Sequence, residues 1–518
     1  MARGAARRER CAQSDAVTAL LASARASAGL DRLARSDPKH WLPQALLCLA
    51  TAMLCAAHQG TLLTLAFPAL ATLVGLWLFF MSPARYVGFV WWMWFLSPEV
   101  RRFADYVKGA YTPTSLIQIA PVAVTMICGI GLVRRYRLLG TWRGLPILLI
   151  LVAIGYAYIV GIGSSGPLAA TYDLANWLYP VLVALHIIAH SRDYPQYRDA
   201  IVSTFVWGML VMGIYGAVQF FFMPAWDAMW MIGSQMNSEG DPVRMGVRVF
   251  STMNSSGPFA FAMMGALVFV PAATQRFRWV AAAAGFAAFG LSLVRSTWGG
   301  WIIALVIQLA KSSNRMRVRT ILGLAVLAGL SMPLLAFGPV AERLSARLQT
   351  VSNLDNDQSY AARNQFYATF AETAFTNVAG TGLGATGTST KLSQPGNGSQ
   401  LGKYGNFDSG VMNIPFVLGW PGTLLYLCGI GWLLARAIRA SFSLGDDKFS
   451  SACLALACSV FAMLVFTNSF VSTGGLLLYT SMASLIAGAH WRKLRAREIR
   501  EHAAALVAPP SVDEASRT

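Results

Sequence analysis

Long runs of apolar residues, separated by short charged or Pro/Gly-rich breaks, repeat along most of this chain. Many of the runs approach the ~20 residues that cross a lipid bilayer as an α-helix. Taken between the breaks, they predict about fourteen membrane-spanning helices. The predicted spans lie near residues 41–57, 61–81, 84–96, 114–133, 144–161, 172–190, 199–222, 256–273, 278–293, 298–310, 320–338, 411–435, 451–468 and 473–489. Two of them, 84–96 and 298–310, are short enough to be re-entrant or tilted against their neighbours.

The composition favours the same class of protein. Of the 518 residues, 55% are hydrophobic and only 12% are charged, whereas a soluble fold carries about a quarter charged residues. The sequence therefore predicts an all-α polytopic membrane protein. Seven cysteines show no metal-ligand spacing, so neither a zinc site nor an iron–sulfur cluster is indicated.

The basic residues indicate how the chain is oriented. If residues 1–40 are cytoplasmic, alternation of fourteen spans places 30 of the 41 Lys and Arg residues inside and 11 outside. This bias follows the positive-inside rule, so the net charge of +18 does not require a nucleic-acid partner. The predicted divisions are a basic N-terminal segment 1–40, eleven helices over 41–338, a large outside loop 339–410, three helices over 411–489 and a cytoplasmic tail 490–518.

Most of the polar chemistry is expected in four outside segments. They are Ser97–Pro113, Phe222–Ser255, the short LVRSTWGGW hairpin around Arg295, and the long stretch Gly338–Gly410. The second half of the long stretch is rich in Gly, Ser, Thr and Asn, which suits a mobile lid or a sugar-contacting surface. Plain disorder is the alternative for that half.

Ionisable residues are nearly absent from the interiors of the predicted spans. Ion-coupled transporters usually keep such residues there, so this pattern weakens an ion-driven transporter without excluding a flippase. Outside, Arg248, Arg295 and Arg363 stand out, because a guanidinium keeps its charge and forks onto phosphate oxygens. Each could instead pair with a local acid or reach towards lipid phosphates.

Three local patterns resemble the O-antigen ligase and polymerase superfamily of membrane glycosyltransferases. The first is Arg248-Val-Phe-Ser-Thr-Met-Asn254-Ser-Ser-Gly-Pro, and the second is Leu-Val-Arg295-Ser-Thr-Trp-Gly-Gly-Trp. The third begins with Ser359-Tyr-Ala-Ala-Arg363, continues through Gly380-Thr-Gly-Leu-Gly384, and ends in Asn406-Phe-Asp408-Ser-Gly before a span. Together they cover about 200 residues in the order and spacing of the family.

The resemblance implies a GT-C-like fold in the bacterial inner membrane, with both termini cytoplasmic and an active site that faces the periplasm. The donor would be an oligosaccharide on a polyprenyl (undecaprenyl) pyrophosphate, and membrane lipid would surround the site. Arg248 and Arg295 would hold the pyrophosphate and stabilise its departure, and Arg363 would contact phosphate or sugar. A chain-length regulator and a flippase are the further partners that the resemblance implies. It also implies that the reaction needs no metal and no cofactor.

One departure from the family concerns the residue before the post-loop span. Ligases of the superfamily carry a His there, but this chain has no His between His190 and His490, and Asp408 takes that place. Asp408 is therefore the candidate base for an acceptor hydroxyl, although it could equally be an ion-pair partner or a helix cap. Asn254, Glu239, Asp241 and Tyr404 are further candidates for substrate binding.

Three functions remain open at this point. The absent His favours a metal-independent polymerase of exopolysaccharide biosynthesis over an O-antigen ligase that moves the glycan to lipid A core or protein. A polysaccharide or lipid transporter is the alternative from a different class, since it also needs many spans and external loops.

Overall fold

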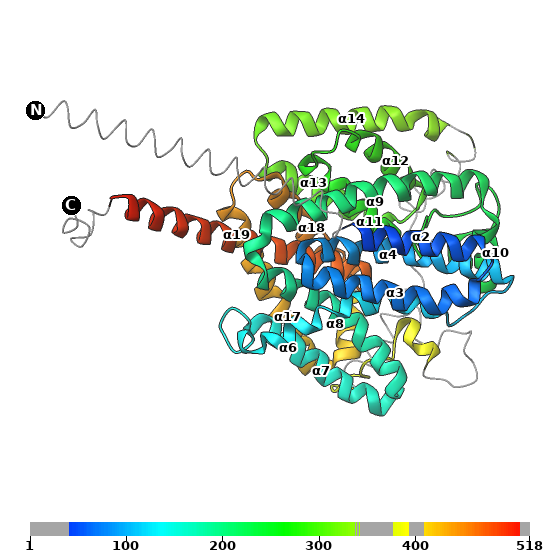
Figure 1. Ribbon diagram of the computed structural model, residues 1–518, viewed down its shortest axis with the longest axis horizontal. Helices are drawn as coiled ribbons and strands as arrows, with labels where there is room; N and C mark the ends of the chain where they lie inside the picture. The colour runs from blue at the N-terminus through cyan, green and yellow to red at the C-terminus, as the bar shows by residue number, and fades with distance from the viewer. Residues whose placement is uncertain (1–40, 337, 339–340, 342–376, 393–408, 508–518) are drawn as a thin grey trace, which may run out of the picture.

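The computed structural model describes residues 41–336, 377–392 and 409–507, together with the single residues 338 and 341. Within these ranges the chain is a bundle of helices that run alongside one another, and α19 projects from one end (Figure 1). The helices are α2 (Leu42–Ala56), α3 (Gly60–Met81), α4 (Pro83–Lys108), α5 (Ile119–Met126), α6 (Gly129–Arg134), α7 (Leu145–Ser165), α8 (Pro167–Ala189), α9 (Tyr194–Phe222), α10 (Ala225–Ser234), α11 (Ser256–Phe269), α12 (Arg278–Leu291), α13 (Arg295–Lys311), α14 (Asn314–Ala336), α17 (Gly410–Ser443), α18 (Lys448–Ala462) and α19 (Ser472–Val507).

Each of the fourteen predicted apolar segments coincides with one or more of these helices. Among the described residues, seven helical stretches are long and apolar enough to cross a membrane. They are Gly60–Met81, Leu116–Arg134, Leu145–Ser165, Pro167–Ala189, Ser191–Phe222, Gly410–Ser443 and Lys448–Val465. The chain is thus a helical membrane protein, as the apolar pattern predicts. The count of fourteen spans, the GT-C-like architecture and the orientation of the termini stay predictions.

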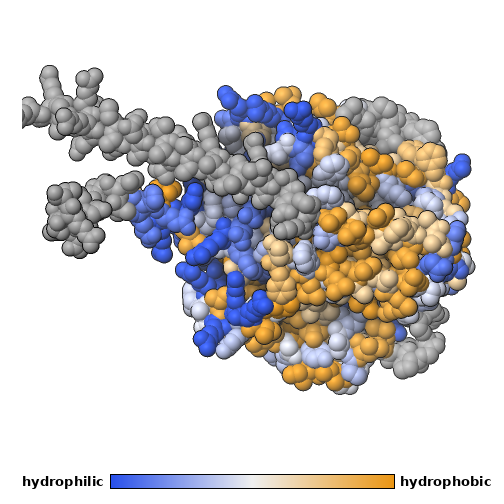
Figure 2. Space-filling model, viewed as in Figure 1, coloured by the Kyte–Doolittle hydropathy of each residue, from blue (hydrophilic) through white to orange (hydrophobic). Residues whose placement is uncertain are grey.

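The outer surface of the bundle is apolar. Hydrophobic residues cover much of the face shown in Figure 2, while hydrophilic side chains gather mainly towards the end from which α19 projects. Leu73, Ile159 and Leu424 are 61%, 73% and 63% exposed, respectively. Contiguous apolar surface is rare on soluble monomers, so we infer that this surface faces lipid.

The interior is formed by helices from distant parts of the chain. α17 packs against α7, α9 against α12, and α19 against both α8 and α18. α11 lies among α9, α12, α13 and α19, and every residue from Phe259 to Phe269 on it is buried. At the end of the bundle where α4 finishes, α4 contacts α9 and α10, and this contact supports the polar site described below.

α4 differs from the sequence-based prediction. The span predicted at 84–96 was expected to give way to an outside loop over Ser97–Pro113, but the helix continues to Lys108 and ends at Gly109, whose φ is +72°. Arg101, Arg102 and Asp105 are therefore buried between helices. The prediction was wrong because a run of charged residues normally marks solvent, whereas here the charges pair with one another inside the protein.

The Gly-rich segment also differs from expectation in the part that the structure describes. Residues Ala379–Gly384 pack into a gap between α7, α8 and α17. The backbone N–H groups of Thr381, Gly382 and Leu383 donate to the carbonyl oxygens of Phe416 (2.8 Å), Val417 (3.0 Å) and Ala157 (2.9 Å), respectively. The Leu383 side chain is fully buried. This part of the segment is therefore neither a mobile lid nor disordered.

Glycine is required at the centre of this segment. Gly382 has a φ of +78°, and a Cβ placed on it would lie 2.2 Å from the backbone nitrogen of Gly161. On the other side of the gap, Gly419 interrupts the helical geometry of α17 with φ 62° and ψ 174°. The carbonyl oxygens that this interruption leaves without helical partners accept hydrogen bonds from the segment instead.

We expect Leu383→Ala to lower the free energy of unfolding by about 2–5 kcal/mol, because the substitution leaves a cavity where the buried side chain lay. Thermal unfolding of the purified protein in detergent measures the change. Leu424→Ala on the lipid-facing side of α17 is the control and should have little effect. Equal losses in the two variants would contradict the packing of the Gly-rich segment into the bundle.

Candidate functional site

Five of the eight site residues predicted from the sequence lie in the described part of the chain. Arg248, Arg295, Asn254, Glu239 and Asp241 belong to two connected turns at one end of the bundle. The other three, Arg363, Tyr404 and Asp408, lie outside the described residues.

A short antiparallel contact brings Glu239 and Arg248 together. Gly240 pairs with Val247, and the Arg248 N–H donates to the Glu239 carbonyl oxygen at 2.8 Å. The Arg248 guanidinium then reaches out of the turn, and its Nη1 donates to the Ser238 carbonyl oxygen at 3.0 Å. The pairing fixes the direction of the Arg248 side chain, so that it points towards the start of α13.

The two arginine motifs meet at this place. Nε of Arg248 donates to the Ser292 carbonyl oxygen at 3.3 Å, and Nη2 lies 3.5 Å from that of Leu293. These carbonyls belong to the turn that ends at Arg295, the first residue of α13. Leu293 has a φ of +54°, which is unusual for a residue with a Cβ and turns the chain sharply into the helix.

Arg295 therefore occupies the N-terminus of a 17-residue helix. Its side chain is half-buried. The first N–H groups of a helix carry partial positive charge, and Arg295 adds a full positive charge to it. The combination is suited to an anion with several oxygens.

Glu239 lies behind Arg248. Its side chain is 3% exposed, and its Oε2 accepts a hydrogen bond from the Ser256 N–H at the start of α11, at 3.2 Å. Burial raises the pKa of Glu239, while the Arg248 guanidinium opposes the rise. Glu239 therefore holds Arg248 and α11 together, whereas the exposed Asp241 and Asn254 are accessible to a ligand.

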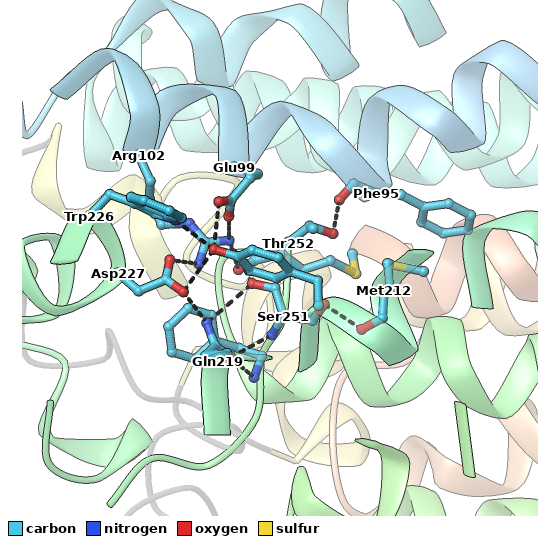
Figure 3. Close-up of polar contacts among 12 residues, drawn as sticks. Phe95, Glu99, Arg102, Met212, Gln219, Trp226, Asp227, Ser251 and Thr252 are labelled. Carbon is cyan, nitrogen blue, oxygen red and sulfur yellow. Dashed lines mark hydrogen bonds and ion pairs between the residues drawn. The ribbon is translucent and has the colours of Figure 1, made fainter. Parts of the chain in front are cut away.

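A second polar cluster, which the sequence did not reveal, lies beneath these turns. We call Glu99, Arg102, Tyr215, Gln219, Trp226 and Asp227 the Arg102 assembly. At its centre the Arg102 guanidinium, 1% exposed, lies 2.6 Å from Asp227 Oδ1 and 2.8 Å from Glu99 Oε2 (Figure 3). In the sequence, the only indication of this assembly is that Glu99 and Arg102 are three positions apart, which places them one turn apart on a helix.

The Arg102 assembly holds the turn between Arg248 and Asn254. Nη2 of Arg102 donates to the carbonyl oxygens of Ser251 at 2.7 Å and Met253 at 3.2 Å. From the other side, Gln219 Oε1 accepts from the N–H groups of Phe250 and Ser251 at 3.1 and 2.8 Å. The buried charges thus fix the backbone that carries the candidate ligand-binding residues.

The donor set around the site is suited to an anion rather than a metal ion. In the part of the chain that the structure describes, no group of three or more His, Cys, Asp or Glu side chains is placed to hold a metal. The arginines, the helix N-terminus and the amide of Asn254 are hydrogen-bond donors of the kind that phosphate oxygens accept.

Comparison of the chain with protein-family models and with curated proteins finds no match. The resemblance to the O-antigen ligase and polymerase superfamily therefore rests on the three sequence patterns alone.

We expect Arg102→Ala to destabilise the protein by about 3–5 kcal/mol, because it leaves the buried Asp227 without its cation. Chemical or thermal unfolding of the protein in detergent measures the loss. Arg244→Ala, which removes an exposed arginine of the neighbouring turn, serves as the control and should lie within about 0.5 kcal/mol of the unchanged protein. A loss below about 1 kcal/mol for Arg102→Ala would show that the buried pairing contributes little.

Proposed function

We propose that the protein is a bacterial inner-membrane polysaccharide polymerase. It transfers a growing glycan from a polyprenyl pyrophosphate carrier to a sugar hydroxyl of a lipid-linked repeat unit, at the periplasmic face of the membrane. The observation that carries this proposal is the convergence of two arginine motifs, in which the Arg248 guanidinium binds the turn that ends at Arg295.

A pyrophosphate at the membrane surface needs the kind of site that these residues form. Two guanidinium groups and the N-terminus of α13 supply positive charge next to a lipid-facing bundle. As the glycosyl bond breaks, negative charge grows on the departing pyrophosphate, and fixed cations nearby lower the barrier. Arginine suits the task because it stays charged and contacts two oxygens at once.

The proposed reaction is a displacement at the anomeric carbon of the donor sugar. The acceptor hydroxyl oxygen forms the new glycosidic bond, the bond from the anomeric carbon to the phosphate oxygen breaks, and its electron pair leaves with the pyrophosphate. The hydroxyl proton passes to a base, for which Asp408 is the candidate. The roles of Asp408, Arg363 and Tyr404 rest on the sequence patterns.

We expect Arg248→Ala and Arg295→Ala each to slow glycan transfer by about 10²–10³-fold, the usual cost of removing one group that stabilises a transition-state charge. The assay extends a synthetic lipid-linked oligosaccharide with the purified protein in nanodiscs. Arg244→Ala is the matched control, because it removes an exposed arginine from the same segment. A chelator of divalent ions should leave the rate unchanged, since the arginines supply the positive charge.

Three outcomes of this assay would contradict the proposal. Transfer at the normal rate in both Arg248→Ala and Arg295→Ala would exclude the arginine mechanism. Strict dependence on a divalent ion would do the same. Transfer of finished glycan to lipid A core or protein, with no extension of repeat units, would identify a ligase instead.

The Arg102 assembly also supports the alternative of a polysaccharide or lipid transporter. Buried ionisable side chains within a helical membrane bundle often mark transport pathways, and the sequence indicates that such residues are nearly absent from the interiors of the predicted spans. Proteoliposomes loaded with a lipid-linked oligosaccharide separate the two functions. Movement of the lipid across the bilayer without any glycan extension would favour transport, and extension without movement would favour the polymerase.

A further inference from the structure

The charges of the Arg102 assembly do not balance if all its acids are ionised. It contains one guanidinium, Arg102, and two carboxyl groups, Glu99 and Asp227, whose side chains are 1%, 8% and 0% exposed. With both carboxyl groups ionised, the buried assembly would carry a net charge of −1. An unpaired buried charge costs several kcal/mol, and one further proton on the assembly would remove it.

The hydrogen bonds around Tyr215 also indicate a missing proton. The Tyr215 hydroxyl lies 2.7 Å from Glu99 Oε1 and 3.0 Å from Asp227 Oδ2, yet it has only one proton to donate. Its oxygen also accepts from the Trp226 indole N–H at 2.6 Å. If both carboxyl groups were ionised, one carboxylate oxygen would face the hydroxyl oxygen with no proton between them.

The donors nearby show which carboxyl group needs the proton. Asp227 Oδ1 accepts from Arg102 at 2.6 Å, and its Oδ2 accepts from Gln219 at 2.8 Å (Figure 3). Glu99 Oε2 lies 2.8 Å from Arg102 Nη2 but accepts no hydrogen bond, and its Oε1 shares the Tyr215 hydroxyl with Asp227. A proton on Glu99 Oε1 would donate to Tyr215, and Tyr215 would then donate to Asp227.

We propose that Glu99 is a neutral carboxylic acid at neutral pH and acts as a positioning residue for the site above it. The chain of donors then runs from Glu99 to Tyr215 to Asp227, and the net charge of the assembly is zero. Arg102 keeps the geometry in which it also binds the carbonyl oxygens of Ser251 and Met253. The effect of Glu99 on glycan transfer rests on the proposed function, whereas the protonation of Glu99 does not.

The pH dependence follows from the groups that face Glu99. The titratable and charged ones are Arg102 on α4 itself, Tyr215 on α9 and Asp227 on α10, and the indole of Trp226 also lies within hydrogen-bonding reach. A carboxyl group that keeps its proton in the folded state, and loses it when unfolded, stabilises the fold at low pH. That stability is lost as the pH rises far enough to ionise Glu99 inside the protein.

The first experiment compares the full chain with Glu99→Gln, which resembles the neutral acid in shape and can donate to Tyr215. Thermal unfolding in nanodiscs is followed from about pH 6 to about pH 10, a range that spans the ionisation of buried carboxyl groups. From the lower to the upper end of this pH range, we expect the Tm of the unchanged protein to fall by at least about 2 °C more than the Tm of Glu99→Gln. Glu99→Ala should be less stable than Glu99→Gln at every pH.

Infrared spectroscopy gives an independent reading. At neutral pH we expect a C=O stretch of a neutral carboxylic acid that disappears in Glu99→Gln. It should persist in Asp105→Asn, the control, which removes another buried carboxyl group of α4 paired with Arg101 and Lys108. If the band is absent, or disappears in Asp227→Asn but persists in Glu99→Gln, the assignment to Glu99 is overturned.

The positioning role has its own test. Glu99→Ala should reduce glycan transfer at least tenfold, and Glu99→Gln should recover most of that loss. If transfer is absent from the unchanged protein, the polymerase proposal fails while the infrared result still decides the protonation of Glu99. If transfer occurs and Glu99→Ala retains full activity, the positioning role fails alone.

Discussion

The candidate site depends on a guanidinium that is removed from water. Arg102 is a residue of α4, but its contacts reach Asp227 on α10 and the carbonyl oxygens of Ser251 and Met253 before α11. A buried charge tolerates few arrangements of its partners, because each donor left unmatched costs the full desolvation of that group. α4, α10 and the turn that carries Arg248 and Asn254 are therefore held in one geometry at this end of the bundle.

Much of the fold could be predicted from the sequence, because lipid imposes a simple rule on the chain. Backbone polar groups in a bilayer must be satisfied within the segment, so apolar runs near the required length form helices. The same rule could not predict the Arg102 assembly. Its charged residues follow a short apolar run, and such a sequence is typical of an exposed loop. Their burial becomes favourable only because residues of α4 pair with Asp227 of α10. Asp227 is a single acid between apolar residues, and nothing in the sequence indicates that it pairs with Arg102.

The site itself was predicted in part. The sequence singled out Arg248 and Arg295, and the structure brings their two turns into contact through carbonyl oxygens that no sequence pattern records. The sequence did not indicate that Glu239 would be buried behind Arg248 while Asp241 stays exposed, although only Gly240 lies between the two acids. The prediction of a mobile or disordered Gly-rich segment was wrong over residues 379–384 for a related reason. Its composition resembles a flexible linker, but its glycines permit close contact between backbones.

The ion pair between Arg102 and Asp227 also sets an order of events during synthesis. The two residues are 125 positions apart, so at roughly 5–20 residues per second Arg102 is made about 6–25 s before its partner. A lone guanidinium in lipid is expensive. Arg102 lies in the last two turns of α4, a place from which a long side chain can extend to a polar membrane surface. We expect the Arg102 end of α4 to stay at the membrane surface, with the guanidinium hydrated, until α9 and α10 have been synthesised and can pack against it. The end of the bundle that bears the candidate site would then be completed only after its helices have entered the membrane.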